Sequence, residues 1–73
     1  MAVLKKYEDI QMKLIRERER REITGVPTST CYVLMSEGRF PKSVKLYGNR
    51  AVAWVYEELV QWNQARVAER DSK

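Results

Sequence analysis

The side chains best suited to chemistry are hydroxyl groups and cations, and they are concentrated between residues 28 and 50. Hydroxyl groups can hydrogen-bond to phosphates or base edges, and arginine and lysine bind phosphates through their charge. An apolar side chain among them could contact the methyl group of thymine. Taken alone, however, the pattern favours an ordinary solvated surface over a DNA-binding one. The residues concerned are Thr28, Ser29, Thr30, Tyr32, Val33, Arg39, Lys42, Lys45 and Arg50.

The residue inventory does not predict catalysis. The 73 residues include no histidine and a single cysteine, Cys31, so no Ser-His or Cys-His pair can form and no zinc site is expected. The chain has no glycine-rich phosphate loop, and the adjacent Glu57 and Glu58 would point to different sides of a helix. We therefore expect a protein that is not an enzyme and that uses neither a metal nor another cofactor.

The charge distribution points to the same stretch. The chain has 14 basic and 10 acidic residues, a net charge of +4, and residues 28–50 contain four of the bases but only one of the acids. The run RERERR at residues 16–21 favours a solvated helix face because acids interrupt it, although Arg16 and Arg18 could reach a flanking phosphate. No apolar run is long enough to span a membrane, and the N-terminus has acids where a signal peptide needs an apolar segment. We expect a cytoplasmic, nucleoid-associated protein without a membrane partner.

The first fifteen residues have the spacing of an amphipathic helix. Its apolar stripe exceeds what a small core needs, so this helix could join copies of the chain into an oligomer or fold back on its own chain. The charged run that follows is predicted to remain helical until Gly25, because glycine readily adopts the left-handed turn that ends a helix. The stripe consists of Val3, Tyr7, Ile10 and Leu14.

A second short helix is predicted between Pro27 and Gly38. Proline is tolerated in the first turn, and Thr28 and Ser29 could cap the free N–H groups there. Two helices joined by a short turn that contains glycine are a candidate helix-turn-helix. The face predicted to dock onto the core carries Cys31, Leu34 and Met35.

A β-hairpin and a last helix complete the predicted elements. The segments SVKL and AVAW flank YGNR, whose Gly-Asn pair suits a tight hairpin turn. The last helix has two apolar stripes, of which one would seal the core and the other could receive the N-terminal helix of the same or another chain. The stripes are Val55, Leu59 and Trp62, and Tyr56, Val60 and Val67.

An ordered set of residues between about 14 and 66 resembles the AlpA-like regulators of prophages, which are related to phage excisionases. The resemblance implies a small DNA-binding protein of the MerR-like winged-helix type. This sequence departs from the family pattern where Arg20 replaces an apolar residue, Pro27 replaces a capping serine, and Thr28 and Val33 replace two arginines. The matching residues are Glu19, Thr24, Gly25, Ser29, Thr30, Tyr32, Leu34, Met35, Glu37, Gly38, Phe40, Pro41, Val44, Lys45, Leu46, Arg50, Ala51, Val52, Trp54, Glu58, Leu59 and Trp62.

With this resemblance, DNA contact becomes the favoured interpretation of the 28–50 surface. The predicted fold is mainly α with a small β-hairpin: a winged helix-turn-helix over residues 16–68, after an N-terminal helix over 1–15 and before a frayed tail over 69–73. The expected function is sequence-specific binding of double-stranded DNA, as a transcriptional regulator or excisionase-type architectural factor of a prophage or integrated element. An integrase or other recombination protein is a further expected partner. The alternative is a protein-interaction module on the same scaffold that binds DNA weakly.

Three further side chains have two interpretations each. Trp54 and Trp62 could stack on unpaired bases, but their spacing favours the core. Cys31 lies on the apolar face of its helix, so we expect a small buried side chain rather than a redox switch.

Overall fold

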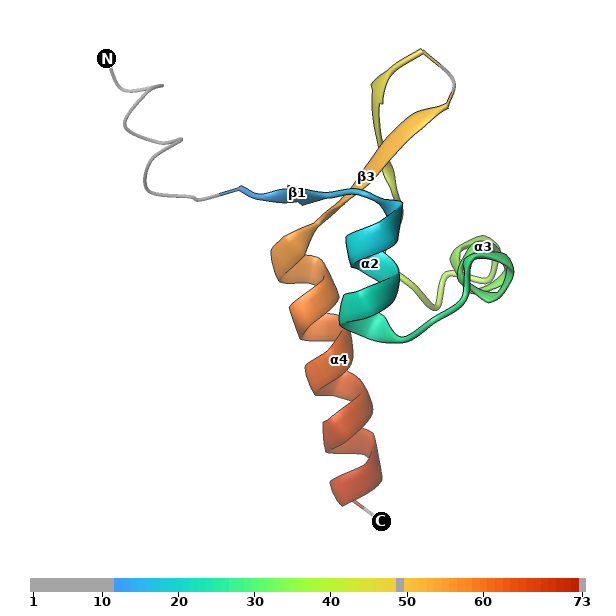
Figure 1. Cartoon of the computed structure of the whole chain (residues 1–73). Coiled ribbons are helices and arrows are strands. Elements are labelled where there is room, and N and C mark those ends of the chain that lie inside the picture. The colour runs from blue at the N-terminus through green and yellow to red at the C-terminus, as the bar shows by residue number, and fades with distance from the viewer. Residues whose placement is uncertain (1–11, 49, 73) are drawn as a thin grey trace.

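The computed structural model describes residues 12–48 and 50–72, which form three helices and three short strands (Figure 1). The described part is therefore mainly α with a β-hairpin, as predicted, and it has one strand more than the sequence predicted. In chain order the elements are β1 (Leu14–Ile15), α2 (Glu17–Thr24), α3 (Thr28–Ser36), β2 (Val44–Tyr47), β3 (Ala51–Val55) and α4 (Tyr56–Asp71).

The extra strand, β1, lies at the edge of an antiparallel sheet with the order β1-β3-β2. Leu14 pairs with Val55 and Ile15 with Trp54, and the N–H of Tyr56 donates to the carbonyl oxygen of Lys13 at 2.8 Å. The prediction that Leu14 lies on a helical stripe is therefore wrong, because its backbone pairs with β3 and its neighbour Ile15 is buried in the core. The other stripe residues, Val3, Tyr7 and Ile10, lie outside the described residues.

The predicted hairpin is confirmed as β2 and β3. Gly48 at the turn has a φ of 62°, a left-handed conformation that glycine adopts without steric cost. Val44 pairs with Ala53 and Lys45 with Val52, but Tyr47 pairs with Ala51, so β2 contains a bulge between Lys45 and Tyr47.

The turn between α2 and α3 also follows the prediction. Gly25 has a φ of 74° and its N–H donates to the carbonyl oxygen of Arg21 at 2.8 Å, which ends α2. The predicted side-chain capping of α3 by Thr28 and Ser29 is wrong: Pro27 is the N-cap, with no side-chain hydrogen bond. The hydroxyl of Thr28 instead donates to Glu17.

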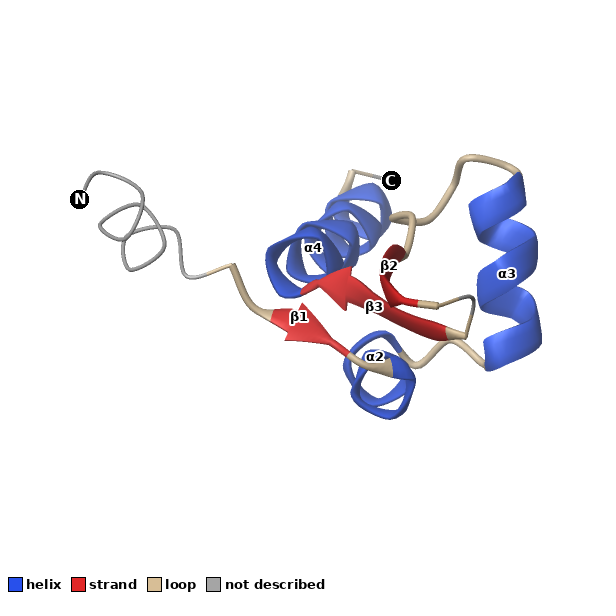
Figure 2. Ribbon diagram, turned by 90° about the horizontal axis from the view of Figure 1, so that it is seen from above, coloured by secondary structure: helices blue, strands red, loops and turns tan. Residues whose placement is uncertain are grey.

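The core is small: it contains Trp54, as predicted, and the partly buried Trp62 packs against it. Trp54 is fully buried, and Trp62 packs edge-on against Phe40 with ring centroids 4.9 Å apart. Cys31 is also buried, and burial raises the pKa of its thiol, which keeps it protonated and favours the predicted structural role. Figure 2 shows the three helices arranged around the sheet that contributes to this core. The buried cluster consists of Ile15, Val26, Cys31, Phe40, Trp54 and Leu59.

The last helix, α4, continues into the predicted tail of residues 69–73. It continues to Asp71, and the N–H of Ser72 donates to the carbonyl oxygen of Ala68 at 3.0 Å. Residues 69–71 of the tail that was predicted to fray are helical in the structure, and the fraying itself stays a prediction. Within the described part of the chain, none of the helices combines the length and the apolar character needed to cross a membrane.

Candidate nucleic-acid interface

The outer face of α3 carries the first group of predicted DNA-binding residues. Its inner face packs Cys31 into the core, and this fixes which side chains point outward. Tyr32 is 47% exposed and Val33 is 53% exposed, and Ser29 and Thr30 are exposed as well. A short helix thus presents two aliphatic hydroxyl groups, one phenol ring with its own hydroxyl and one branched apolar side chain to solvent.

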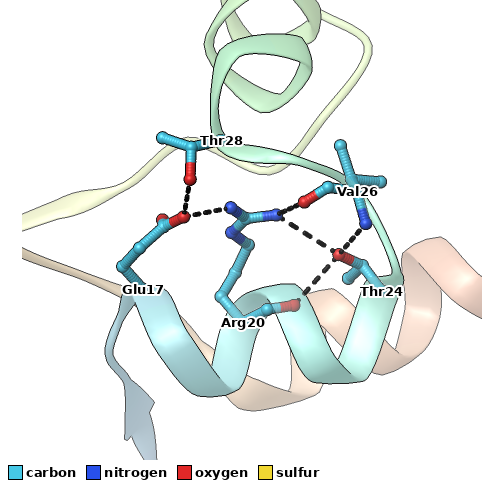
Figure 3. A network of polar contacts seen from close by, with 5 residues as sticks. All are labelled: Glu17, Arg20, Thr24, Val26 and Thr28. Atoms are coloured by element: carbon cyan, nitrogen blue, oxygen red, sulfur yellow. Dashed lines mark hydrogen bonds and ion pairs between the residues drawn. The ribbon is translucent and has the colours of Figure 1, made fainter.

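Thr28 belongs to the same helix, but its hydroxyl is already engaged. It donates to Oε2 of Glu17, and the same oxygen accepts from Arg20 Nη2 at 2.6 Å (Figure 3). Thr28 therefore connects the start of α3 to the start of α2. Among the α3 residues predicted to contact DNA, Thr28 is the one whose side chain is held by a hydrogen bond to another helix.

The side chain at the centre of this network, Arg20, is fully buried. Its Nη1 donates to the carbonyl oxygen of Val26 at 2.5 Å, and its guanidinium lies 5.3 Å from the ring of Trp54 and 5.9 Å from that of Phe40. Arg20 thus occupies a core position, where its guanidinium lies near two aromatic rings and is hydrogen-bonded to the α2–α3 turn. The sequence feature that could have indicated this ion pair is Glu17, which lies three residues before Arg20, at the spacing of a helical ion pair.

The network also perturbs its carboxylate. Burial acts to raise the pKa of Glu17, but the hydrogen bonds from Thr28 and Arg20, together with the nearby charges of Arg20 and Arg21, outweigh it and hold the pKa below its usual value. Glu17 is therefore ionised at neutral pH and forms an ion pair with the buried arginine.

The loop after α3 carries Arg39 and Lys42, both exposed. Arg39 Nη1 forms an ion pair with Glu37 at 3.1 Å, which offsets part of its charge. Its carbonyl oxygen accepts a hydrogen bond from Trp62 Nε1 at 2.8 Å, so α4 fixes the loop. Lys42 forms no ion pair among the described residues, so no carboxylate offsets its charge.

The hairpin carries Lys45 and Arg50, also exposed. The bulge in β2 lies next to Tyr47, whose side chain is 71% exposed. Tyr47 and Arg50 line an open groove of about 520 Å³ together with Gly48, Ala51 and Arg16. Tyr47 was not predicted as a site residue. The bulge that changes its register cannot be recognised from the alternation of polar and apolar residues in the sequence.

Arg16 joins this hairpin from the start of α2. Its Nε donates to the carbonyl oxygen of Val52 at 3.1 Å, across 36 residues of sequence. From the sequence, Arg16 could be recognised only as the first residue of a basic run that acids interrupt. Its place beside the hairpin depends on β1, which was not predicted.

The predicted residues are distributed over α3, the loop that follows it and the hairpin. In both views, α3 and the tip of the β2–β3 hairpin lie on the same side of the molecule, with α4 on the other (Figures 1 and 2). The structure therefore brings the elements that carry them to one side. Across residues 12–48 and 50–72, no three histidine, cysteine or acidic side chains come close enough together to hold a metal ion.

Two comparisons with known proteins bear on this interface. Residues 13–67 match the family described as "Prophage CP4-57 regulatory protein (AlpA)". The chain is also 37% identical over 60 residues to a protein of Enterobacteria phage P4 that is named "Uncharacterized protein ORF88". That match covers 82% of this chain and 67% of the phage protein. The matched region of the family includes every element of the structure except the last turn of α4.

Proposed function

The chain belongs to the AlpA family of prophage regulatory proteins, and from this premise we propose that it binds duplex DNA in a sequence-dependent manner. It would do so as a transcriptional regulator, or as an architectural factor in excision of the element that encodes it. This role places it at the nucleoid, in the cytoplasm.

The exposed outer face of α3 is the observation that carries the proposal. In a helix-turn-helix protein the second helix enters the major groove, and here α3 follows α2 after a glycine turn. A helix with Tyr32 and Val33 more than 45% exposed leaves apolar surface in water unless a ligand covers it. Thymine methyl groups and the sugar edges of the groove would cover it.

The cations beside α3 then position the helix on the DNA. Lys42, Lys45 and Arg50 would contact backbone phosphates, which sets register and supplies salt-dependent affinity. Arg39 would contribute less because Glu37 offsets its charge. The hairpin would act as the wing of a winged helix.

A gel-shift titration at several salt concentrations tests this function, with duplexes from the promoter and the attachment site of the element. Wild-type protein should bind with an affinity that falls steeply as salt rises. Val33→Glu should abolish binding, because it places a carboxylate on the α3 face against phosphates. Ala65→Glu, an equal charge change at an exposed position of α4, is the control and should retain most of the affinity.

Absence of binding by the wild type at low salt would contradict the proposal. Equal loss of affinity in Val33→Glu and Ala65→Glu would instead mean that α3 is not the DNA-contacting element. The two results can be told apart on the same gel.

The second candidate function is a protein-interaction module on the same scaffold. It is favoured by a mainly apolar groove of about 530 Å³ between α2 and α4, lined in part by Ile23, Val60 and Val67. Tyr56 at its end is 39% exposed and Val67 is 48% exposed. We propose that a second copy of the chain covers this groove, using the stripe of Val3, Tyr7 and Ile10. An integrase or other recombination protein is the competing occupant.

A further inference from the structure

The groove between the hairpin tip and the start of α2 is a second charged site, separate from the α3 face. Arg16 and Arg50 come from positions 34 residues apart, yet both line it. Arg16 precedes the first turn of α2 and Arg50 lies at the hairpin turn. The fold therefore brings two guanidinium groups to one open depression on the surface.

Arg16 is held in place by the sheet. Its Nε donates to the carbonyl oxygen of Val52 at 3.1 Å, which restrains the side chain while leaving the two terminal nitrogens to bind a ligand. A guanidinium restrained in this way loses less conformational freedom on binding than a free one. This is the geometry of a positioned anion-binding group rather than of a solvated surface arginine.

The charge of the groove is not balanced by the protein. Among residues 12–48 and 50–72, neither Arg16 nor Arg50 forms an ion pair, whereas Arg20, Arg39, Arg66 and Arg70 each do. The described lining has no carboxylate, and its remaining polar side chain is Tyr47. Two like charges beside one groove repel each other and are stabilised by an anion between them.

We propose that Arg16 and Arg50 together hold one backbone phosphate of duplex DNA in this groove, with the Tyr47 hydroxyl as an added donor. A phosphodiester suits the site because guanidinium groups match its oxygens in a bidentate fashion. An open groove also lets the polymer continue past on both sides. The inference rests on the proposed function, and it adds α2 to the elements that grip the DNA.

The test is the salt dependence of duplex binding by four full-length variants. Arg16→Gln and Arg50→Gln should each weaken binding about tenfold, and each should reduce the slope of log K against log salt by about 0.9. The double variant should weaken binding by clearly less than one hundredfold, since loss of one arginine already opens the clamp. Arg70→Gln, with the same charge change near the far end of α4, should leave the slope unchanged.

Arg16→Lys separates positioning from charge. Lysine keeps the charge but cannot reproduce the Nε hydrogen bond to Val52, so the salt slope should be retained while affinity falls severalfold. Full additivity of Arg16→Gln and Arg50→Gln would overturn the shared phosphate. An Arg16→Gln variant that behaves like Arg70→Gln would overturn the role of Arg16 while leaving the proposed function standing. A wild type that does not bind duplex at all would contradict the proposed function itself.

A competition arm identifies the source of the phosphate. Inorganic phosphate and sodium sulfate at equal ionic strength should compete equally and weakly, because a single ion lacks the contacts that α3 makes. The groove binds free phosphate if two results are found together. Inorganic phosphate must displace DNA from the wild type far more strongly than sulfate does, and it must fail to displace DNA from Arg16→Gln. That result would overturn the assignment to the DNA backbone.

Discussion

The guanidinium of Arg20 is fully buried. The groups around it therefore determine how much stability is lost when Arg20 or one of its partners is substituted. A buried charge is expensive unless a partner compensates it. Here Glu17 supplies the compensation, and its own side chain is 37% exposed. The two members of the pair are therefore unequal in burial: the Glu17 side chain is partly exposed, although its Oε1 atom is itself buried without a hydrogen-bond partner, whereas the Arg20 side chain is fully buried.

This inequality predicts an asymmetric response to mutation. Glu17→Met should reduce the free energy of unfolding by about 3–5 kcal/mol, because it leaves a buried cation uncompensated. Arg20→Met should cost less, about 1–3 kcal/mol, because methionine fills the space beneath Trp54 and Phe40 but leaves the buried carbonyl oxygen of Val26 without its donor. Urea unfolding followed by circular dichroism measures both.

The double variant Glu17→Met with Arg20→Met provides the control. It should be more stable than Glu17→Met alone, because the buried cation is gone. Equal destabilisation by the two single substitutions would contradict the account, since it would mean that the partners are equally dependent on each other.

The depressed pKa of Glu17 predicts how stability changes with acid. Its folded-state pKa lies below its unfolded value, which is about 4.3. The ionised carboxylate therefore stabilises the fold fully above that unfolded value, and the contribution is lost as pH falls through the folded pKa. Between pH 5 and pH 3, wild type should lose stability more steeply than Glu17→Gln.

Thermal unfolding across that pH range checks this expectation. Glu22→Gln removes an exposed carboxylate from the same helix and serves as the matched control. If Glu17→Gln and Glu22→Gln flatten the profile equally, the network around Arg20 does not account for the acid response.

Among the elements, α3 determines which base pairs the protein can recognise. It presents no arginine or lysine, and a bidentate arginine–guanine contact contributes about 1–3 kcal/mol of discrimination. We therefore expect a preference for A·T-rich sequence and modest affinity for a single site. Thr28 hydrogen-bonds to Glu17, so Val33 is the position from which recognition can be altered without disturbing the fold.

Val33→Arg should tighten DNA binding and shift the selected sequence toward guanine. Binding-site selection from randomised duplexes measures the shift. Ala65→Arg adds the same charge on α4 and should tighten binding without changing the selected sequence. A wild type that already selects a G·C-rich site with high affinity would refute this account of α3.

The elements also show why part of the site was predictable. The β2–β3 hairpin and the inward face of α3 follow from neighbours in sequence: a glycine turn at Gly48, and Cys31, Leu34 and Met35 at helical spacing. The outward residues of α3 then follow by exclusion. Local pattern was enough for these features.

The remaining features depend on contacts between distant residues. The two-residue strand β1 exists because Leu14 and Ile15 pair with Val55 and Trp54, some 40 residues later. Arg16 reaches the hairpin only because β1 leads the chain there, and Arg20 is buried against the rings of Phe40 and Trp54, which lie 20 and 34 residues later in the sequence. No local periodicity encodes such contacts, so the strand and both arginine environments were missed.

For the whole molecule, the apolar groove between α2 and α4 predicts association of copies. The chain enters the described region beside this groove, since Lys13 Nζ lies 5.5 Å from the ring centroid of Tyr56. Burying one apolar side chain contributes about 1.5–3 kcal/mol. Val67→Asp should therefore weaken association at least tenfold. It should leave the fold of the monomer intact, because Val67 lies on an exposed face of α4.

Sedimentation velocity over a range of concentrations tests the association. Tyr7→Asp should have the same effect as Val67→Asp if the N-terminal stripe is the covering surface. Gln61→Asp, an exposed position on α4 outside that groove, should leave association unchanged. A wild type that stays monomeric at every concentration would contradict the assembly.

The unequal burial of Glu17 and Arg20 also has an evolutionary consequence. An acid at position 17 beside an apolar residue at position 20 should cost less stability than an arginine at position 20 without that acid, because the arginine would be a fully buried charge with no partner. We therefore expect that the acid arose before the arginine and that the arginine is lost before the acid. Among relatives, sequences with an acid at 17 and an apolar residue at 20 should be common, and the reverse combination should be rare.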